Sequence, residues 1–457
     1  MSQAIEMPRA AHRRWPTLNA EVLIALTAAF LVCVDNVSFW RAVLEGRTWL
    51  DASTWSFAFG VLVLLVGAYY FLLSVCAVRA LLKPILIGAL VAGAVVAYYI
   101  DHYNVVLDPA MVRNVLHTDA HEAVELLDRD LLVTFLLLAV LPAAAVMRVN
   151  VSERSWRRGF ALRALTSVAA LAIAVGALLA VFQDIAPLMR SRHEVRHMLT
   201  PLNLFVSAAR SLRSDIGAAV ATMEPLVPVT RVAAGGDRPT LFVLVVGETA
   251  RAANFSLNGY ARETNPELSK LDIINFPQTH SCGTSTEVSL PCMFSPFGRR
   301  SYDETRIRRH ESLVQQVARA GIRVIWRDNQ SGCKGVCAGV EVESFEQLEL
   351  PGVCANGRCF DEVLLHGLDK ITAEPARDMM LVLHQIGNHG PAYYRRYPPA
   401  FKQFEPACET DALHNCSPQE IVNAYDNALL YTDHALAELI KFLQTQRSRY
   451  DVALIYV

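Results

Sequence analysis

The stretch Leu241-Phe242-Val243-Leu244-Val245-Val246-Gly247-Glu248-Thr249 decides the fold of the C-terminal half of this 457-residue chain. Its apolar run is typical of a strand buried on both faces of a sheet. Later runs of the same kind are Ile322–Trp326, Met379–Leu383 and Val452–Val457. Helical patterns at Ser312–Ala320 and Ile421–Gln444 alternate with these runs. The alternation predicts an α/β domain with a mostly parallel sheet that helices cover on both faces.

Polar residues follow the first three of these runs. They are Gly247-Glu248-Thr249, Arg327-Asp328-Asn329-Gln330, and the stretch from His384 to His389-Gly390-Pro391. Ligands of such sheets bind beyond the carboxyl ends of the strands. A capping or loop role explains any one set, but three converging sets favour a functional site.

A loop rich in small hydroxyl residues lies between the first two strands. It reads Cys282-Gly283-Thr284-Ser285-Thr286-Glu287-Val288-Ser289-Leu290-Pro291-Cys292. If its two cysteines pair, the loop becomes a rigid staple that presents hydroxyls at the start of a helix. A hydroxyl beside a helix N-terminus and a metal can act as a nucleophile. Taken alone, a loop of this composition is usually only a loop.

The cysteines after residue 280 indicate an oxidising compartment. Their proximity suggests the pairs Cys282–Cys292, Cys333–Cys337, Cys354–Cys359 and Cys408–Cys416. Eight cysteines allow 105 connectivities, so proximity does not settle the pairing. A zinc–cysteine cluster is the alternative, since short Cys-x3-Cys and Cys-x4-Cys spacings are present.

The N-terminal part carries an apolar excess. Hydrophobic residues make up 53% of the chain and charged residues 19%, with a net charge of −2. Soluble domains average about 45–50% and about 25%, and the balanced charge argues against nucleic acid as a partner. Five runs approach the ~20 residues that cross a bilayer. They are Val22–Leu44, Trp55–Val78, Leu81–Ile100, Leu131–Met147 and Ala164–Phe182.

Basic residues predict the orientation of these spans. They concentrate in the N-terminal arm and in the second-to-third and fourth-to-fifth loops, which places those segments in the cytoplasm. We therefore expect a five-span membrane domain at 1–184, an amphipathic connector and linker at 185–238, and an exported domain at 239–457. For any single run, the alternative to a membrane span is a buried core helix. Asp35 and Asn36 interrupt the first span.

The loop 101–130 between the third and fourth spans is too long for a tight turn. Asn114, Thr118 and Glu122 recur every four residues, so on a helix they would share one face. Such a face could hold a polar lipid headgroup at the membrane surface. The solvated face of an interfacial helix explains the spacing equally well.

Several motifs, taken in order, resemble one known family. They are Val246-Gly247-Glu248-Thr249-Ala250-Arg251, Asn254-Phe255-Ser256-Leu257-Asn258-Gly259-Tyr260, the Cys282–Cys292 loop, and His384-Gln385-Ile386-Gly387-Asn388-His389-Gly390-Pro391. They resemble the lipid A phosphoethanolamine transferases, which include the mobile colistin-resistance enzymes and belong to the alkaline phosphatase and sulfatase superfamily. The resemblance covers nearly the whole chain. It implies a bacterial inner-membrane protein with a catalytic domain of that superfamily in the periplasm.

The resemblance implies roles for individual residues. Thr286 stands four residues after the first loop cysteine, where the family has its nucleophile. Glu248 and Thr286 would bind the catalytic zinc ion. His389 matches a histidine near the substrate phosphate or a second zinc ion, so the family pattern allows one zinc or two.

Further positions match substrate contacts of the family. Lys334 matches a basic residue that contacts the transferred group, and Gln330 stands where family members often have Asn. Asn114, Thr118 and Glu122 match membrane-loop residues that help to shape the lipid site.

One departure from the family concerns the end of the sequence. In the family, the strand that corresponds to Val452–Val457 is followed at once by Ser-Asp-His-Gly, whose Asp and His complete the zinc site. The sequence ends at Val457, so we expect a chain that is truncated at its C-terminus and an incomplete metal site. Asp433 and His434 cannot substitute, because they lie within a helical pattern that the family shares.

The resemblance implies transfer of phosphoethanolamine from phosphatidylethanolamine to lipid A, through a zinc-assisted phosphoethanolamine-threonine intermediate in a monomer. The modified lipid A would bind cationic peptides such as polymyxin less well. Alternatives are a transferase that acts on lipopolysaccharide core or another glycan, a hydrolase, or an inactive truncated membrane protein of the same family.

Overall fold

The computed structural model describes residues 16–76, 80–116, 118, 120–152, 154–220, 224, 238–374 and 376–457. The chain divides into two compact units, residues 1–108 with 129–208, and residues 109–128 with 209–457. Residues 109–128, from the expected membrane loop, therefore leave the first unit and pack in the second. We call them the inserted segment.

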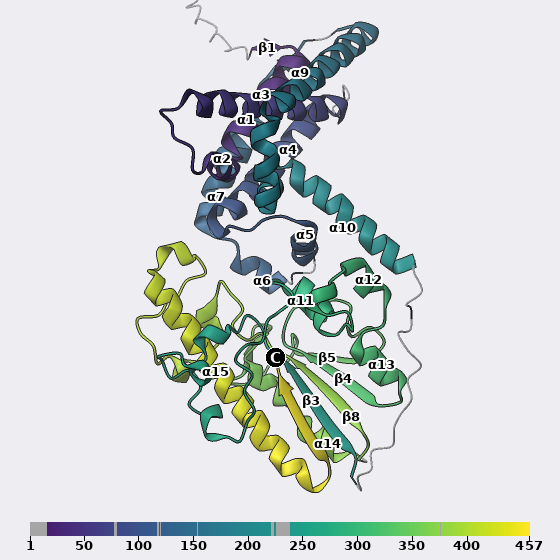
Figure 1. Ribbon diagram of the computed structural model, residues 1–457, viewed down its shortest axis with the longest axis vertical. Coiled ribbons are helices and arrows are strands. Elements are labelled where there is room, and N and C mark those ends of the chain that lie inside the picture. The colour runs from purple at the N-terminus through teal and green to yellow at the C-terminus, as the bar shows by residue number, and fades with distance from the viewer. Residues whose placement is uncertain are drawn as a thin grey trace, which may run out of the picture. The chain divides into compact units, whose positions relative to one another are not determined.

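Apolar helices form the first unit (Figure 1). Within the described residues, four helical stretches are long and apolar enough to cross a membrane. They are α3 (Ala52–Cys76), α4 (Leu82–Tyr103), the continuous stretch of α7 (Arg129–Phe135), η1 (Leu136–Val140) and α8 (Leu141–Arg148), and α9 (Trp156–Ser191). A fifth span results if the bent pair α1 (Ala20–Val34) and α2 (Val37–Leu44) counts as one. The expectation of a helical membrane domain is confirmed.

The first span is not the continuous helix expected over Val22–Leu44. Helices α1 and α2 meet at 59°, because Asn36 forms hydrogen bonds that a straight helix would not allow. Its side-chain amide donates to the carbonyls of Leu31 (2.8 Å) and Thr200 (2.9 Å), and its Oδ1 accepts from the Thr200 N–H (2.8 Å). The polar interruption seen in the sequence is therefore a bend fixed by a distant turn.

The last apolar helix is longer than expected. Helix α9 has 36 residues, or about 54 Å at 1.5 Å per residue, and it continues to Ser191 through the first part of the expected connector. Beyond it lie the 3-10 turn η2 (His193–His197) and α10 (Leu202–Val220). Gly235 and Gly236, in the expected linker, lie outside the described residues.

A five-stranded parallel sheet forms the centre of the second unit (Figure 1). Its order is β5-β4-β8-β3-β9. The strands are β3 (Thr240–Val246), β4 (Arg323–Asp328), β5 (Glu341–Ser344), β8 (Met379–His384) and β9 (Asp451–Tyr456). The expected α/β fold with a mostly parallel sheet is confirmed.

Both faces of β3 are buried, which explains its unbroken apolar run. Leu241, Val243 and Val245 belong to a core that includes residues of α14 (Leu368–Ala373) and α15 (Pro418–Thr445). Leu244 and Val246 belong to the opposite core, beneath α11 (Thr286–Met293) and α13 (Leu313–Arg319). Alternate side chains of a strand point to opposite faces, so each face needs its own apolar set.

Capping residues set the starts of α13 and α15. Ser417 accepts a hydrogen bond from the N–H of Glu420 (3.3 Å), whose carboxylate accepts from the Ser417 N–H (2.7 Å). Ser312 and Gln315 form the same reciprocal pair before α13. Such capping boxes satisfy N–H groups that have no partner inside the helix.

The remaining elements are short. They are α5 (Pro109–Leu116), α6 (Ala120–Glu125), α12 (Glu304–Arg309), the pair β1 (Thr17–Leu18) and β2 (Asn150–Val151), the hairpin β6 (Cys354–Ala355) and β7 (Arg358–Cys359), and 3-10 turns. Disulfides join Cys282–Cys292, Cys333–Cys337, Cys354–Cys359 and Cys408–Cys416.

Candidate active site

Glu248 and Thr286 meet beyond the carboxyl end of β3. Thr286 Oγ1 donates a hydrogen bond to Glu248 Oε2 (2.9 Å), and Thr249 Oγ1 donates to Glu248 Oε1 (2.7 Å). Glu248 follows the strand by two residues, and Thr286 is the first residue of α11. The fold thus brings together the two residues that the sequence marked as metal ligands.

The start of α11 favours negative charge near Thr286. Ser285, the residue before the helix, has extended backbone angles and makes no side-chain capping bond. The first N–H groups of a helix carry partial positive charge. The disulfide from Cys282 to Cys292, with its α-carbons 6.4 Å apart, closes the loop that presents Thr286. An oxygen anion on Thr286 would therefore form in a favourable electrostatic environment.

The loop after β8 is locked against Glu248. The Asn388 N–H donates to the Glu248 carbonyl oxygen (3.0 Å). Gly387 has φ +51°, and a β-carbon there would lie 2.6 Å from that oxygen. Only glycine tolerates both the backbone angle and the close approach.

Asp361 holds the same loop from the other side. Its carboxylate accepts hydrogen bonds from the N–H groups of Ile386 and Gly387 and from the Asn329 side chain, each 2.9 Å long. Burial raises the pKa of Asp361, although these hydrogen bonds act in the opposite direction. The sequence did not single out Asp361, since the acidic pair Asp361-Glu362 after Phe360 gives no local signal.

His389 lies at the far end of this loop and is half-buried. Its N–H donates to the Ile386 carbonyl (3.1 Å), and its carbonyl accepts from Arg396 Nε (2.7 Å). His384, at the end of β8, is instead a core residue. Its Nδ1 pairs with Asp328 Oδ1 at 2.7 Å. Burial would raise the pKa of Asp328, but the hydrogen bond and charge of His384 hold it below its usual value.

Gln330 and Lys334 line separate pockets. Gln330 lines a pocket of about 70 Å³ together with Glu125 and Arg396. Lys334 lines another of about 290 Å³. The Lys334 ammonium donates to the Ser331 carbonyl (2.7 Å) and hydroxyl (2.9 Å). The loop after β4 thus places the two predicted substrate contacts in different pockets.

The predicted face of Asn114, Thr118 and Glu122 is not on one helix. Asn114 lies in α5, Thr118 follows its end, and Glu122 lies in α6. Thr118 Oγ1 donates to the Asn114 carbonyl (2.8 Å), so its hydroxyl is used locally. The premise of a continuous helix was therefore wrong. Helix α5 ends at Leu116 and α6 begins at Ala120, and the side chain of Glu122 lies outside the described part of the structure.

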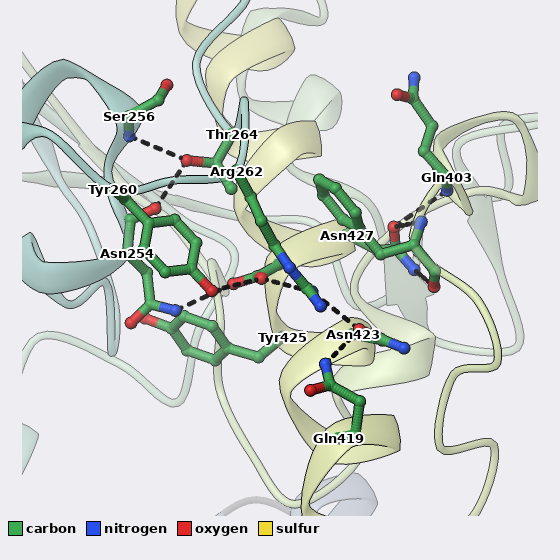
Figure 2. Close-up of polar contacts among 12 residues, drawn as sticks. Asn254, Ser256, Tyr260, Arg262, Thr264, Gln403, Gln419, Asn423, Tyr425 and Asn427 are labelled. Atoms are coloured by element: carbon green, nitrogen blue, oxygen red, sulfur yellow. Dashed lines mark hydrogen bonds and ion pairs between the residues drawn. The ribbon is translucent and has the colours of Figure 1, made fainter.

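The motif from Asn254 to Tyr260 anchors the segment that follows β3 to α15. The fully buried Asp426 carboxylate accepts from Asn254 Nδ2 (2.9 Å), Tyr260 Oη (2.8 Å) and Arg262 Nη1 (2.9 Å). Figure 2 shows these side chains converging on one face of the helix. The motif therefore fixes the loop after β3 to the buried Asp426 of α15.

Tyr425, one residue before Asp426, fixes the loop that carries Glu248. Its hydroxyl donates to the Thr249 carbonyl and accepts from the Arg251 N–H, both at 2.8 Å (Figure 2 labels Tyr425). Burial raises the pKa of Tyr425 to about 12, so the phenol stays neutral and can donate.

Two family models match the chain. A sulfatase model matches residues 240–457, and a model of the phosphoethanolamine transferases EptA/EptB matches residues 65–216. The phosphoethanolamine transferase EptA of Salmonella typhimurium is 35% identical over 450 residues, which cover 97% of this chain and 81% of the relative. This chain belongs to the phosphoethanolamine transferase family.

Further relatives agree with this family. The phosphatidylethanolamine transferase Mcr-1 of Escherichia coli is 36% identical, with coverage of 95% of this chain and 83% of Mcr-1. The integral membrane protein lipooligosaccharide phosphoethanolamine transferase A from Neisseria meningitidis has a similar structure. Its TM-score is 0.90 at 36% identity, with 96% of this chain and 82% of that chain covered. The resemblance read from the sequence is confirmed.

Two groups of side chains in this phosphoethanolamine transferase offer metal ligands. Glu248 and Thr286 present oxygens 2.9 Å apart, and a carboxylate oxygen such as that of Glu248 is a usual zinc ligand. Among the described residues, Glu267, His434 and Glu438 form a second group. There the ammonium of Lys441 already pairs with both carboxylates, at 3.2 Å from Glu267 and 2.6 Å from Glu438. The first group therefore fits a catalytic metal better.

Proposed function

We propose that this phosphoethanolamine transferase moves phosphoethanolamine from phosphatidylethanolamine to a lipid A phosphate through a covalent intermediate on Thr286. The hydrogen bond from Thr286 Oγ1 to Glu248 Oε2, 2.9 Å long, carries the proposal. The name of one relative supports the donor, because Mcr-1 is named a phosphatidylethanolamine transferase. An Escherichia coli relative is named a Kdo(2)-lipid A phosphoethanolamine 7''-transferase, which supports a lipid A-based acceptor but does not name a phosphate.

The first half-reaction forms a bond between Thr286 Oγ1 and the donor phosphorus. Glu248 orients the hydroxyl, and the start of α11 favours the developing oxygen anion. The bond from phosphorus to the diacylglycerol oxygen breaks, and the threonine proton ends on that oxygen. Diacylglycerol leaves, and phosphoethanolamine stays on the threonine.

The second half-reaction transfers the group onward. An oxygen of a lipid A phosphate attacks the same phosphorus, and Thr286 leaves and regains a proton. We assign substrate contacts to His389, Lys334 and Gln330 and, on the inserted segment, to Asn114, Thr118 and Glu122. Neither half-reaction consumes water, so the site must exclude water from the intermediate.

Glu248 and Thr286 would hold one zinc ion, with His389 near a second if two bind. Zinc would lower the pKa of the threonine hydroxyl and offset negative charge on the phosphoryl oxygens. The pairing of a carboxylate with a hydroxyl supports this assignment, because a lone hydrogen bond would not activate a threonine strongly.

The apolar helices and the disulfides support a place in the bacterial inner membrane. We place the N-terminus in the cytoplasm, on the basic residues of the loops, and the catalytic unit in the periplasm, where disulfides form. We expect a monomer whose substrates diffuse in the bilayer. Phosphoethanolamine adds an ammonium beside a lipid A phosphate, so the modified surface should bind polymyxin less well.

Mass spectrometry of lipid A from cells expressing the protein tests the acceptor. We expect a phosphoethanolamine adduct on a phosphate, absent from cells with Thr286→Ala. Unmodified lipid A together with a modified core would assign the core as acceptor. Donor labelled in its headgroup should also label the Thr286 peptide, and lipid A should remove that label. A peptide that never becomes labelled would overturn the intermediate.

A further inference from the structure

The inserted segment supplies two buried charges of opposite sign to the second unit. Arg113, in α5, is 2% exposed, and Glu125, the last residue of α6, is 3% exposed. Burying a charge is costly unless a partner compensates it. The positions of their partners therefore show what the segment does.

Arg113 acts on the helix that carries Thr286. Its guanidinium forms ion pairs with Glu304 and with Glu287, the latter at 3.9 Å. Glu287 directly follows Thr286 and is 1% exposed. Arg308 also pairs with Glu287, so two guanidinium groups fix the first turn of α11.

Glu125 acts on the loop that carries His389. Its Oε2 accepts from Arg396 Nη2 at 2.7 Å, and the same guanidinium donates from Nε to the His389 carbonyl at 2.7 Å. Arg358 and Arg395 stand near Glu125 Oε1 at 3.4 and 3.6 Å. Arg396 thus links the inserted segment directly to the main chain of His389.

The contacts of Arg113 and Glu125 add to the interactions that hold the candidate site from within the domain. Glu248 and Asp361 hold the loop at Ile386–Asn388 from within the domain. The carbonyl of His389 is held by Arg396, whose own charge is compensated by Glu125. Buried ion pairs often add little net stability, but in some proteins they select one arrangement of the segments they join. Here the ion pairs of Arg113 and Glu125 therefore act mainly by positioning the segments that they join.

We propose that Arg113 and Glu125 are positioning residues, and that the inserted segment is a clamp that holds the Thr286 helix and the His389 loop in register for phosphoryl transfer. The catalytic part of this inference rests on the proposed function. The geometric part does not rest on it, because it concerns how firmly the Thr286 helix and the His389 loop are held in the free protein.

The test uses the full chain in detergent and the variant Glu125→Gln, which removes the charge but keeps the shape. We expect kcat for release of diacylglycerol from phosphatidylethanolamine to fall about 10- to 100-fold, with KM changed less than about threefold. Hydrogen exchange should accelerate in the peptide that contains His389, because the loop opens more often. Glu405→Gln is the control, since that carboxylate is exposed and pairs with the partly exposed Lys402 at 3.4 Å.

Further variants complete the test. Arg113→Gln should accelerate exchange in α11 instead of the His389 loop. Arg396→Lys keeps the charge and should lose less kcat than Arg396→Gln. If Glu125→Gln does not fold, Glu125→Asp retains the charge with a shorter reach and should show the same pattern more weakly.

The outcomes separate the inference from the proposed function. Wild-type protein without turnover would refute the proposed function, while exchange still decides whether the clamp orders the loops. A Glu125→Gln variant that melts earlier, but keeps the kcat and loop exchange of the wild type, would reduce the pair to structural support and overturn the inference.

Discussion

The carbonyl oxygen of Glu248 lies so close to Gly387 that a β-carbon on the glycine would stand 2.6 Å from it. The carboxylate of the same Glu248 accepts the hydrogen bond of Thr286. A change at Gly387 therefore reaches the candidate nucleophile through a single residue.

Replacing Gly387 by alanine should lower activity about 100-fold, because Glu248 must shift to relieve the contact. Gly259→Ala is the matched control. Gly259 also has a positive φ, +94°, but nothing lies within 4 Å of its added β-carbon. Both variants carry the same kind of backbone strain, of about 1–2 kcal/mol. Equal loss of activity in the two would show that the contact with Glu248 is unimportant.

Removing the Thr286 hydroxyl should abolish transfer without unfolding the protein. We expect Thr286→Ala to lose about three orders of magnitude or more in diacylglycerol release, while Thr286→Ser retains measurable activity. Thr284→Ala, on the exposed part of the same loop, should behave as wild type. Strong activity in Thr286→Ala would move the nucleophile to another residue.

Breaking the Cys282–Cys292 disulfide should reduce activity more than it reduces folding, because the bond closes the loop that presents Thr286. Loss of a disulfide typically costs about 2–4 kcal/mol. The pair Cys408–Cys416 serves as the control, since its loop lies elsewhere. Both double serine variants should melt earlier, but only the first should lose most of its kcat. A larger loss of kcat in the Cys408–Cys416 variant would exclude a role for the Cys282–Cys292 disulfide in presenting Thr286.

The buried carboxylate of Asp426 should be important for stability. Asp426→Asn removes the charge that pairs with Arg262 and leaves an amide facing donors from Asn254 and Tyr260. We expect a loss of about 1–3 kcal/mol in the free energy of unfolding. Asp451→Asn changes an ion pair that is half exposed, so it should cost less than about 1 kcal/mol. Thermal melting in detergent compares them, and equal costs would contradict the network in Figure 2.

The raised pKa of Asp433 should make the stability of the protein depend on pH. Burial raises the pKa of this carboxyl from 3.8 to about 6. The folded state therefore binds a proton more tightly than the unfolded state between about pH 4 and 6, and the Asp433 contribution to stability decreases as pH rises through that window. Asp433→Asn should flatten the change in melting temperature from pH 4 to 6. A slope identical to that of the wild type would show that another group is responsible.

The sequence predicts those parts of the fold in which local pattern and final environment agree. Leu241–Val246 is apolar without a break because both faces of β3 are covered. The edge strand β5, Glu341–Ser344, was not predicted, because its side chains are mostly exposed and polar. Asn36 was recognised as an interruption, but the bend depends on Thr200, far along the chain.

The candidate site likewise contains some residues that the sequence predicts and others that it does not. Glu248 and Thr286 stand in recognisable motifs, and the fold brings them together. Arg396 and Glu125 are separated by 271 positions, and nothing local indicates that either charge is buried. Contacts of this kind are set by how the two segments pack in three dimensions, which neither periodicity nor composition encodes.

The polypeptide passes between its two units three times, after residues 108, 128 and 208. A protease cut after residue 208 would therefore leave the inserted segment on a different fragment from the sheet. A recombinant fragment starting near Pro239 would contain the sheet and the threonine, yet it would lack Arg113 and Glu125. Turnover numbers obtained from such a soluble fragment would then describe an enzyme without part of its scaffold.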